Sequence, residues 1–272
     1  MVFNNAQASR RLAAEYSANA DAYSRHWAPV IHPMARLLLG ALPLESARHV
    51  LDLCCGTGDL LVDLRSHAPR ARLVGGDRAE GMIRVARQNV SCSLLVTDAL
   101  SLALRTGTFD VAILAFALFH VPDPKMALRE VWRVLRPHGV VGLVTWGADP
   151  GTPGTAIWKE ELDACGAAAD PRDAVVMRQA EMDTPDKLVG LLRETGFAPP
   201  RIWSECLAHP WTVDALFALQ TRCGMPARRL ATLSKKAQAI CRERVRSRVA
   251  TLTADDLVYR AQVLFAVARR RD

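Results

Sequence analysis

The sequence VLDLCCGTG at residues 50–58 decides how this chain folds. The apolar run from His49 to Leu53 has the length and composition of a buried β-strand. Gly56 and Gly58 predict a tight turn after it, and an amphipathic helix is expected over residues 59–66. A strand, a glycine-rich turn and a helix in this order are typical of α/β sheets, in which ligands bind at the carboxyl ends of the strands.

Further apolar runs follow at short intervals and alternate with amphipathic segments such as residues 124–135. The run at 109–116 is apolar almost throughout, as expected for a strand that is buried on both faces. This alternation predicts a doubly wound parallel sheet of the α/β class. We expect seven strands, the first at 49–53 and the others at residues 72–76, 93–96, 109–116, 140–146, 201–211 and 257–268.

The composition is that of an ordinary globular protein. Of 272 residues, 50% are hydrophobic and 23% are charged, which excludes disordered, collagen-like and disulfide-scaffold classes. The seven cysteines form no C-x-x-C pair and share no ligand spacing with histidines, so we expect reduced thiols in a cytoplasmic protein without a metal site. The longest apolar run, residues 111–119, is too short to span a membrane, and the N-terminus lacks the apolar run of a signal peptide.

The formal net charge of +7 is concentrated at one end of the chain. Residues 222–272 contain 13 Lys/Arg and 4 Asp/Glu, whereas residues 1–221 carry a small acidic excess. Nucleic-acid binding would require aromatic side chains between the basic ones, and residues 222–256 contain none. We therefore expect a solvated basic face and no nucleic-acid partner, although some arginines could steer an anionic substrate. The basic residues concerned are Arg228, Arg229, Lys235, Lys236, Arg242, Arg244, Arg246 and Arg248.

The charges at the glycine turn indicate which kind of ligand it binds. A third glycine is missing after Gly58, so the dinucleotide fingerprint is incomplete. Asp52 and Asp59 flank the turn and would repel a pyrophosphate, whereas they would attract the ammonium and sulfonium groups of S-adenosylmethionine. The turn therefore favours that cationic cofactor over NAD, and an NAD-dependent oxidoreductase is the weaker alternative.

The same turn resembles motif I of the class I S-adenosylmethionine-dependent methyltransferases. It is most similar to the branch of ubiquinone and menaquinone biosynthesis, which also includes small-molecule tailoring enzymes. The resemblance spans about residues 48–147, and Cys54, Phe119 and His138 depart from the family pattern. It implies a Rossmann-like methyltransferase sheet with a helical cap. The further matching segments are LVGGDRAEGM at 73–82, TDA at 97–99, FDV at 109–111, LFHVPDP at 118–124 and LREVWRVLRPHG at 128–139.

The resemblance also implies which residues contact the cofactor. Asp77 lies 19 residues after Gly58, where an acid would accept hydrogen bonds from the ribose hydroxyls, and it can also cap the next helix. Met82 is expected to pack against the adenine, although it could simply be a core residue. Asp98 is expected to contact the adenine amino group, although it could simply be an acid in a turn. The complete expected set is Tyr23, Asp52, Cys54, Gly56, Thr57, Gly58, Asp77, Arg78, Met82, Asp98, Ala99, Leu100 and Ala115.

The methyl acceptor is expected on the other side of the cofactor. His120 follows the fourth strand and is either a general base or a structural histidine; the sequence leaves both roles open. Tyr16, like Tyr23, lies on the N-terminal helices and belongs either to a hydrophobic lid or to the site. The other candidates for substrate contact are His26, Trp27, Phe119, Trp146 and Trp158, of which each tryptophan is by default a core residue.

These expectations combine into one structural domain and one function. The protein is predicted to methylate an oxygen or a carbon of a small, aromatic, polyketide-, terpenoid- or quinone-like acceptor in secondary metabolism. A reaction without methyl transfer, such as a cyclisation around bound cofactor, is an open alternative. The sequence also leaves open whether the protein is a monomer or a homodimer. The expected stretches are an N-terminal helical lid (1–45), the cofactor-binding core (46–147), a cap insertion (148–195) and the last two strands with a basic helical segment (196–272).

Overall fold

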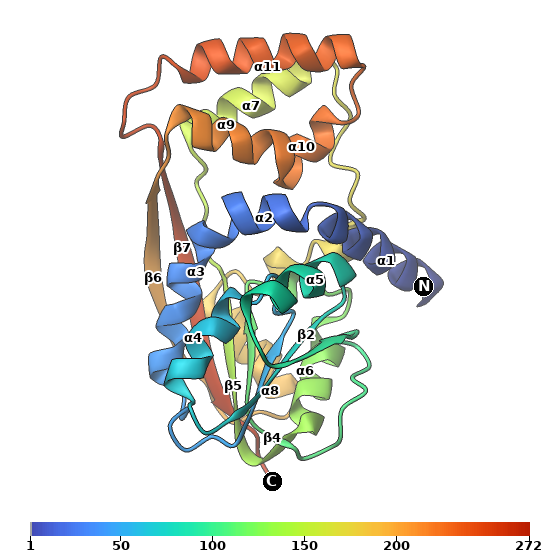
Figure 1. The fold of residues 1–272 in the computed structure, drawn as a ribbon, viewed down its shortest axis with the longest axis vertical. Coiled ribbons are helices and arrows are strands. Elements are labelled where there is room, and N and C mark those ends of the chain that lie inside the picture. Colours follow the sequence, from blue (N-terminus) through green and yellow to red (C-terminus); the bar gives the residue numbers. More distant parts are fainter. Residues whose placement is uncertain (1) are drawn as a thin grey trace.

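A single seven-stranded sheet organises the computed structural model, which describes residues 2–272 (Figure 1). The strand order is β3-β2-β1-β4-β5-β7-β6. The first five strands are parallel, as expected from the sequence. β7 is antiparallel to both of its neighbours, so the sheet is mixed. The strands are β1 (His49–Leu53), β2 (Arg72–Asp77), β3 (Ser93–Val96), β4 (Phe109–Ala115), β5 (Leu135–Trp146), β6 (Arg201–Pro210) and β7 (Val258–Arg269).

The reversal of β7 has a simple geometric cause. Pro210 at the end of β6 pairs with Val258 at the start of β7, so the two strands form a hairpin. The connection of this hairpin, residues 211–257, is long enough to contain helices of its own. The chain therefore leaves the sheet and returns to it at the same end, and an antiparallel pair is the only arrangement that this path allows.

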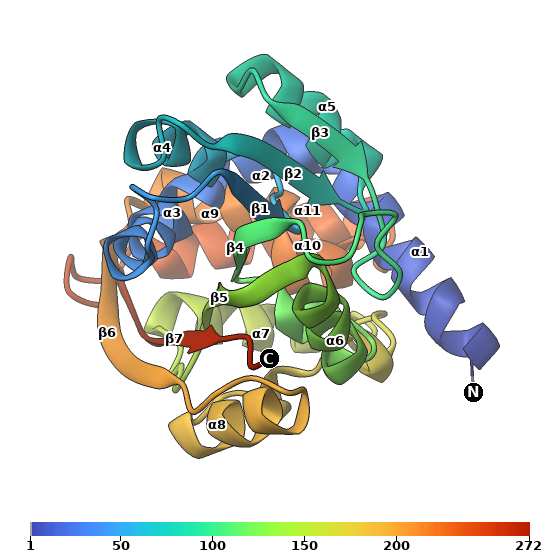
Figure 2. The same cartoon turned by 90° about the horizontal axis from the view of Figure 1, so that it is seen from below.

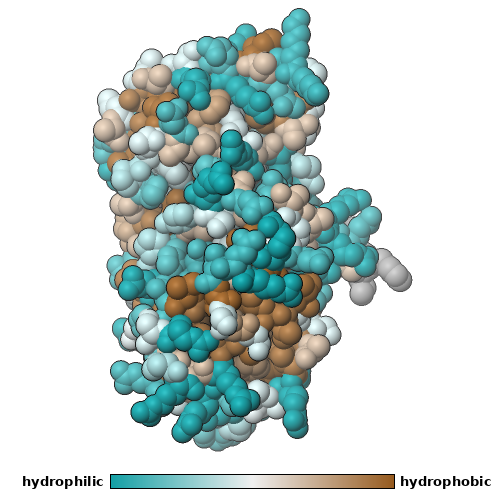
Figure 3. Space-filling model, in the orientation of Figure 1, coloured by the Kyte–Doolittle hydropathy of each residue, from teal (hydrophilic) through white to brown (hydrophobic). Residues whose placement is uncertain are grey.

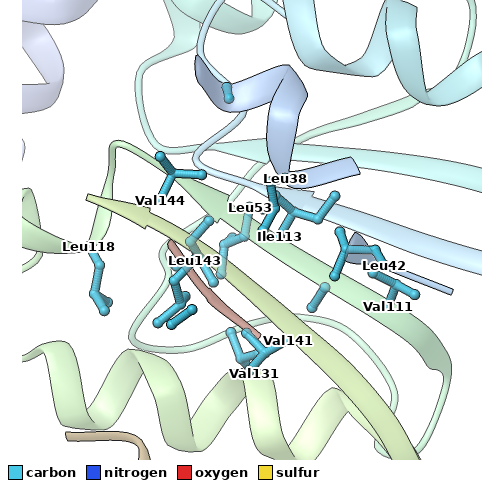
Figure 4. Packing of buried hydrophobic residues seen from close by; sticks show 14 of the residues in the cluster. Leu38, Leu42, Leu53, Val111, Ile113, Leu118, Val131, Val141, Leu143 and Val144 are labelled. Carbon is cyan, nitrogen blue, oxygen red and sulfur yellow. The ribbon is translucent and has the colours of Figure 1, made fainter. Parts of the chain in front are cut away.

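Helices cover both faces of the sheet. α3 (Ala28–Leu37) and α4 (Asp59–His67) lie on one face, while α6 (Pro124–Val134) and α8 (Pro185–Glu194) lie on the other (Figure 2). α5 (Glu80–Asn89) packs against β2 and β3. Aliphatic side chains of the central strands fill the space between the layers, and Figure 4 shows Leu53, Val111, Ile113, Val141, Leu143 and Val144 among them.

A separate group of helices forms a cap beyond the sheet (Figure 1). It consists of α7 (Pro153–Ala164) together with α9 (Val213–Arg222), α10 (Gly224–Leu230) and α11 (Lys235–Val249). The cap has its own hydrophobic cluster, in which Trp158, Leu162, Leu216, Leu230, Cys241, Val245 and Val249 are buried.

The stretch 148–195, expected as a cap insertion, is divided between the cap and the sheet. α8 belongs to the sheet, because Leu188, Leu191 and Leu192 are buried in the core of the sheet. Within the same stretch, α7 ends at Ala164. Gly166 adopts a φ of +76°, which ends the helix, and only two short 3₁₀ turns, Ala174–Val176 and Gln179–Glu181, follow.

The basic segment joins the cap rather than the sheet. The arginines of α11 lie on the outer surface, where polar side chains predominate (Figure 3). Arg248 pairs there with Glu160 and Glu161 of α7, at 2.6 and 2.8 Å.

No helix within residues 2–272 is both long and apolar enough to cross a membrane.

The N-terminal helices lie between the sheet and the cap, as Figure 1 shows for α2 (Ala20–His26). α1 (Val2–Ala18) crosses α5 at Gly81, whose backbone N–H donates to Ser17 Oγ at 3.2 Å. A Cβ atom at this glycine would stand 2.2 Å from the carbonyl oxygen of Ser17. The close approach of the two helices therefore requires glycine at this position.

Replacing Gly81 by alanine should displace α1 while the sheet stays folded. The clash is with backbone, so we expect the substitution to lower the free energy of unfolding by about 2 kcal/mol. Tryptic cleavage after Arg10 and Arg11 of α1 should accelerate. Gly190→Ala is the matched control, because nothing lies within 4 Å of its Cβ position. Equal proteolysis of the two variants would show that α1 does not depend on this contact.

Candidate active site

The turn after β1 has an unusual backbone. Cys54, Gly56 and Gly58 all have positive φ angles, of 60°, 53° and 83°. Only glycine adopts such angles without strain, so Cys54 occupies a position that glycine would fill at lower cost. Burial raises the pKa of the Cys54 thiol well above its ordinary value, so the side chain stays protonated and unreactive.

The carboxylate of Asp77 holds this turn in place. Its Oδ2 atom accepts the N–H of Gly56 at 2.9 Å, and its Oδ1 atom accepts the N–H of Ala79 at 2.8 Å. Burial raises the pKa of Asp77, and the two N–H donors oppose that rise. Asp77 therefore links the glycine turn to the start of α5, and its side chain also lines the cavity above the turn.

Asp52 is buried nearby without a polar partner. It is 2% exposed, and its Oδ2 atom accepts no hydrogen bond from the described residues. Burial and the neighbouring charges of Asp77 and Asp59 raise its pKa to about 8. An unpaired carboxyl group among other acids is costly, and a bound cation would relieve that cost.

An acid and a base that pair with each other, Asp98 and Arg78, also line the cavity. Asp98 Oδ2 pairs with Arg78 Nη1 at 2.7 Å, and its Oδ1 accepts the N–H of Leu100 at 3.1 Å. The carboxylate is thus held by a turn and an arginine, and it still faces the cavity. Met82 and Ser9 also line this cavity, and the buried hydroxyl of Ser9 has no partner among the described residues.

His120 stands where this cavity meets a second one. Its Nε2 atom lies 3.0 Å from Tyr16 Oη. Burial, with a smaller effect of Arg172, lowers the pKa of His120 to about 4, and burial raises the pKa of Tyr16 to about 12. Both side chains are therefore uncharged at neutral pH.

The second cavity lies between the sheet, the N-terminal helices and the cap. It shares Tyr16, Tyr23, Phe116 and His120 with the first cavity. Aromatic side chains form part of its walls: Trp27 and Trp146 have ring centroids 6.1 Å apart, and Phe116 and Trp146 have centroids 4.6 Å apart. The two cavities adjoin at His120, so a ligand in each would meet there.

Most of the expected site residues line these cavities. Asp52 and Thr57 line a smaller space beside the turn. Gly58 supports the turn, because its missing Cβ would stand 3.0 Å from Ala86 Cβ. The expected residues at the first cavity are Tyr16, Tyr23, Cys54, Gly56, Asp77, Arg78, Met82, Asp98, Ala99, Ala115 and His120, and those at the second also include Trp27, Phe119 and Trp146.

Two of the expected acceptor contacts are misplaced. Trp158 is fully buried in the cluster of the cap, where its ring packs against Phe217 with centroids 5.6 Å apart. His26 lines neither of the two cavities; burial and the nearby Arg222 lower its pKa. Both positions follow from the packing of α7 and α2, which the local sequence pattern does not specify.

The tertiary structure brings two arginines to the site: Arg172, which the sequence did not single out, and Arg228 of the basic segment. Arg172 and Arg228 line the second cavity. Arg228 pairs with Glu15 at 2.6 Å and with Asp170 at 3.2 Å, and Arg172 pairs with Asp170 at 2.8 Å. The expectation of a solvated basic face is therefore wrong for Arg228, whose side chain is 13% exposed. Gln220 lines the same cavity from α9.

Comparison with known proteins agrees with this geometry. A methyltransferase-domain family matches residues 50–139. The demethylmenaquinone methyltransferase of Thermus thermophilus is 40% identical over 104 residues, which are 36% of this chain and 47% of that protein. The enzyme of the same name from Lactococcus lactis is 36% identical over 99 residues, which are 34% of this chain and 39% of that protein.

The family match identifies residues 50–139 as a methyltransferase domain. The chain spans about half the length, or less, of these curated relatives. A solved structure, phosphoethanolamine N-methyltransferase 2 of Haemonchus contortus with phosphomonomethylethanolamine and S-adenosylhomocysteine, shares the fold. It superposes with a TM-score of 0.55 at 16% identity and covers 94% of this chain and 58% of that one.

The residues around the glycine turn fit a cationic cofactor such as S-adenosylmethionine. S-adenosylmethionine is cationic at its methionine end, and the unpaired carboxyl of Asp52 lies beside the glycine turn. A Cβ at Gly56 would lie 3.9 Å from the ring of Tyr23, so this part of the turn is open to a ligand. No group of His, Cys, Asp and Glu within the described residues could hold a metal ion.

Replacing Asp77 by alanine should weaken cofactor binding. The substitution removes the acceptor for the turn and the acid expected at the ribose hydroxyls, so the Kd for S-adenosylhomocysteine should rise by about 10- to 100-fold. Calorimetric titration measures this change. Asp21→Ala, which removes an exposed ion pair with Arg84, is the control and should bind as the wild type does. Unchanged affinity in Asp77→Ala would refute the assignment.

The buried carboxyl of Asp52 should make cofactor binding depend on pH. Below about pH 8 the group holds a proton in the free protein, and a cation bound beside it favours the carboxylate. S-adenosylmethionine binding at pH 7 should therefore release a proton, and affinity should rise with pH up to about 8 and then level off. Calorimetry in buffers of different ionisation enthalpy measures the release. Asp52→Asn should abolish it; equal release from both proteins would contradict this role.

Proposed function

We propose that this protein transfers a methyl group from S-adenosylmethionine to an oxygen or carbon of a small aromatic acceptor. The observation that carries the proposal is the junction of the two cavities at His120. One cavity has the acids and the open glycine turn of a cofactor site, and the other has aromatic walls. A cofactor and an acceptor bound in them would face each other at this histidine.

The chain's contribution to such a reaction is alignment and exclusion of water. The cofactor supplies a methyl group that its sulfonium already activates. Tyr16 and Tyr23 of the N-terminal helices lie over the boundary between the cavities, and the cap closes the acceptor side. Holding two reactants in line in a closed site lowers the entropic part of the barrier.

The aromatic side chains around the second cavity favour a flat, apolar acceptor. Trp27, Phe116, Phe119 and Trp146 offer ring faces and edges for stacking, which suits an aromatic or quinone-like ring system. Two relatives are named for demethylmenaquinone, a quinone. The segment that matches these relatives covers only the cofactor side of the site. We therefore propose for this chain only a class of acceptor, a quinone- or polyketide-like ring, and not demethylmenaquinone itself.

His120 is suited to take the proton of a hydroxyl acceptor. Its pKa of about 4 leaves it neutral, and its hydrogen bond with Tyr16 orients the ring. A hydroxyl oxygen becomes far more acidic as it gains the methyl group, so even this weak base can accept its proton. Bound S-adenosylmethionine would supply the methyl group, and the hydroxyl would give its proton to His120, which would pass it on to solvent. An electron-rich carbon would depend less on this base.

We also propose that the protein acts on small molecules in the cytoplasm as a tailoring enzyme of secondary metabolism. The described cysteines are all free, as expected in a reducing compartment. The arginines of α11 lie on the outer surface of the cap rather than in the cavities, which supports a small-molecule substrate instead of a nucleic acid.

His120→Ala tests the proposed reaction. We expect it to slow methyl transfer to a hydroxyl acceptor by about 100-fold or more, because the proton loses its acceptor, while S-adenosylhomocysteine binding stays unchanged. Formation of S-adenosylhomocysteine is measured with reduced demethylmenaquinone and a panel of hydroxylated aromatics. His26→Ala is the matched control and should retain the wild-type rate. Bound cofactor without transfer to any acceptor of the panel would favour the non-methylating alternative, and no cofactor binding at millimolar concentration would overturn the proposal.

A further inference from the structure

Arg172 places a largely buried guanidinium group in the wall of the acceptor cavity. It lies in the segment between α7 and α8, its side chain is 17% exposed, and it lines the second cavity. A charged group is costly to bury unless partners or a ligand compensate it. The hydrogen-bond donors of this arginine that have no partner in the protein therefore indicate what it can still bind.

Asp170 occupies only one edge of that guanidinium group. Its carboxylate accepts the Nε–H of Arg172 at 3.1 Å and an N–H of Nη2 at 2.8 Å, which together form the side edge of the planar group. The end edge, formed by Nη1 and the second N–H of Nη2, has no acceptor among the described residues, and Nη1 is accessible to solvent. Two parallel N–H groups on one edge match the two oxygens of a carboxylate.

Arg133 shows how this fold satisfies an arginine that has a structural role. Its side chain is 31% exposed, and it donates with all five N–H groups, to the carboxylate of Glu130, two backbone carbonyls and a hydroxyl. Arg172 is more buried, yet it keeps a whole edge free. A structural role alone therefore does not account for its place in the cavity wall.

The charges around the second cavity leave its wall positive. Among the described residues, the charged side chains that line it are Glu15, Arg172 and Arg228, whereas Asp170, which pairs with both arginines, does not line it. Glu15 and Arg228 pair with each other at 2.6 Å, so the charge of Arg172 is the one left at the surface of the cavity. Burial lowers the pKa of His120 most, and the charge of Arg172 is the next largest cause, so its field reaches the junction of the cavities.

We propose that Arg172 is a specificity-determining residue that binds a carboxylate of the acceptor. The acceptor would be a hydroxylated aromatic acid, with its ring against Trp27 and Trp146 and its carboxylate on the free edge of Arg172. Asp170 would act as a positioning residue that holds the guanidinium group by its other edge. This inference deepens the proposed function and rests on it for the identity of the cavity. The site should then discriminate between aromatic acids and neutral phenols of the same ring.

The test compares the binding of aromatic acids with that of neutral phenols, so its outcome is independent of methyl transfer. The probes are 1-hydroxy-2-naphthoate and 6-hydroxy-2-naphthoate, with 1-naphthol and 2-naphthol as their neutral counterparts. They are titrated calorimetrically into protein saturated with S-adenosylhomocysteine. Arg172→Gln keeps an amide donor for Asp170 but removes the charge and the free edge. Arg246→Gln is the matched control, because it removes the same charge from an exposed position on α11, outside both cavities.

The wild-type protein should bind one of the naphthoates about 10- to 100-fold more tightly than its neutral counterpart. Arg172→Gln should lose this preference and keep its affinity for the naphthols and for S-adenosylhomocysteine, whereas Arg246→Gln should bind every probe as the wild type does. Arg172→Lys, which keeps the charge without the planar edge, should retain part of the preference.

The absence of a preference in the wild type would overturn the proposal, and so would a preference that survives in Arg172→Gln. Equal weakening of acid and phenol in that variant would show a purely structural role and would also overturn it. Methyl transfer to phenols without any preference for acids would leave the proposed function intact and refute this inference alone. A preference that depends on Arg172 would support the inference even where no methyl group is transferred.

Discussion

The two hydrogen bonds of the Asp77 carboxylate hold the glycine turn against the start of α5, and the rest of the site is built around that turn. They connect Gly56, in the turn after β1, with Ala79, at the start of α5. One side chain thus fixes the relative positions of two strand ends, and the cofactor cavity is the space above them. The same carboxylate contributes to the acidic field that raises the pKa of Asp52. A cationic ligand at the glycine turn would therefore meet both a rigid backbone and the unpaired carboxyl of Asp52.

The lid depends on a contact at α5, next to this turn. α1 approaches α5 closely enough only because Gly81 has no side chain, and that approach brings Tyr16 to His120. The cap reaches the same point from the opposite direction, because β6 and β7 form a hairpin whose connection folds over the N-terminal helices. Arg228 joins the two layers through Glu15 and Asp170. The acceptor cavity is therefore enclosed by three parts of the chain that are far apart in sequence.

In the reaction that we propose, this construction would separate cofactor binding from acceptor choice. The cofactor cavity uses backbone turns and acids at strand ends, whereas the acceptor cavity uses aromatic side chains and polar groups of the cap. The cap has its own hydrophobic cluster, so its inner surface can change without disturbing the core of the sheet. His120 stands at the boundary with a lowered pKa, and Gln220 and Arg228 line the acceptor side from the cap.

The sequence by itself determined the order of strands and helices, the glycine turn with its acids, and the family of the domain. These features are local: a buried strand, a positive φ and a strand-end acid each leave a pattern within about ten residues. Only the tertiary structure decided the direction of β7, the place of α8 on the sheet and the burial of Trp158 in the cap. It alone also brought Arg172, Gln220 and Arg228 to the acceptor cavity, because long-range packing selects among surfaces that look alike in sequence.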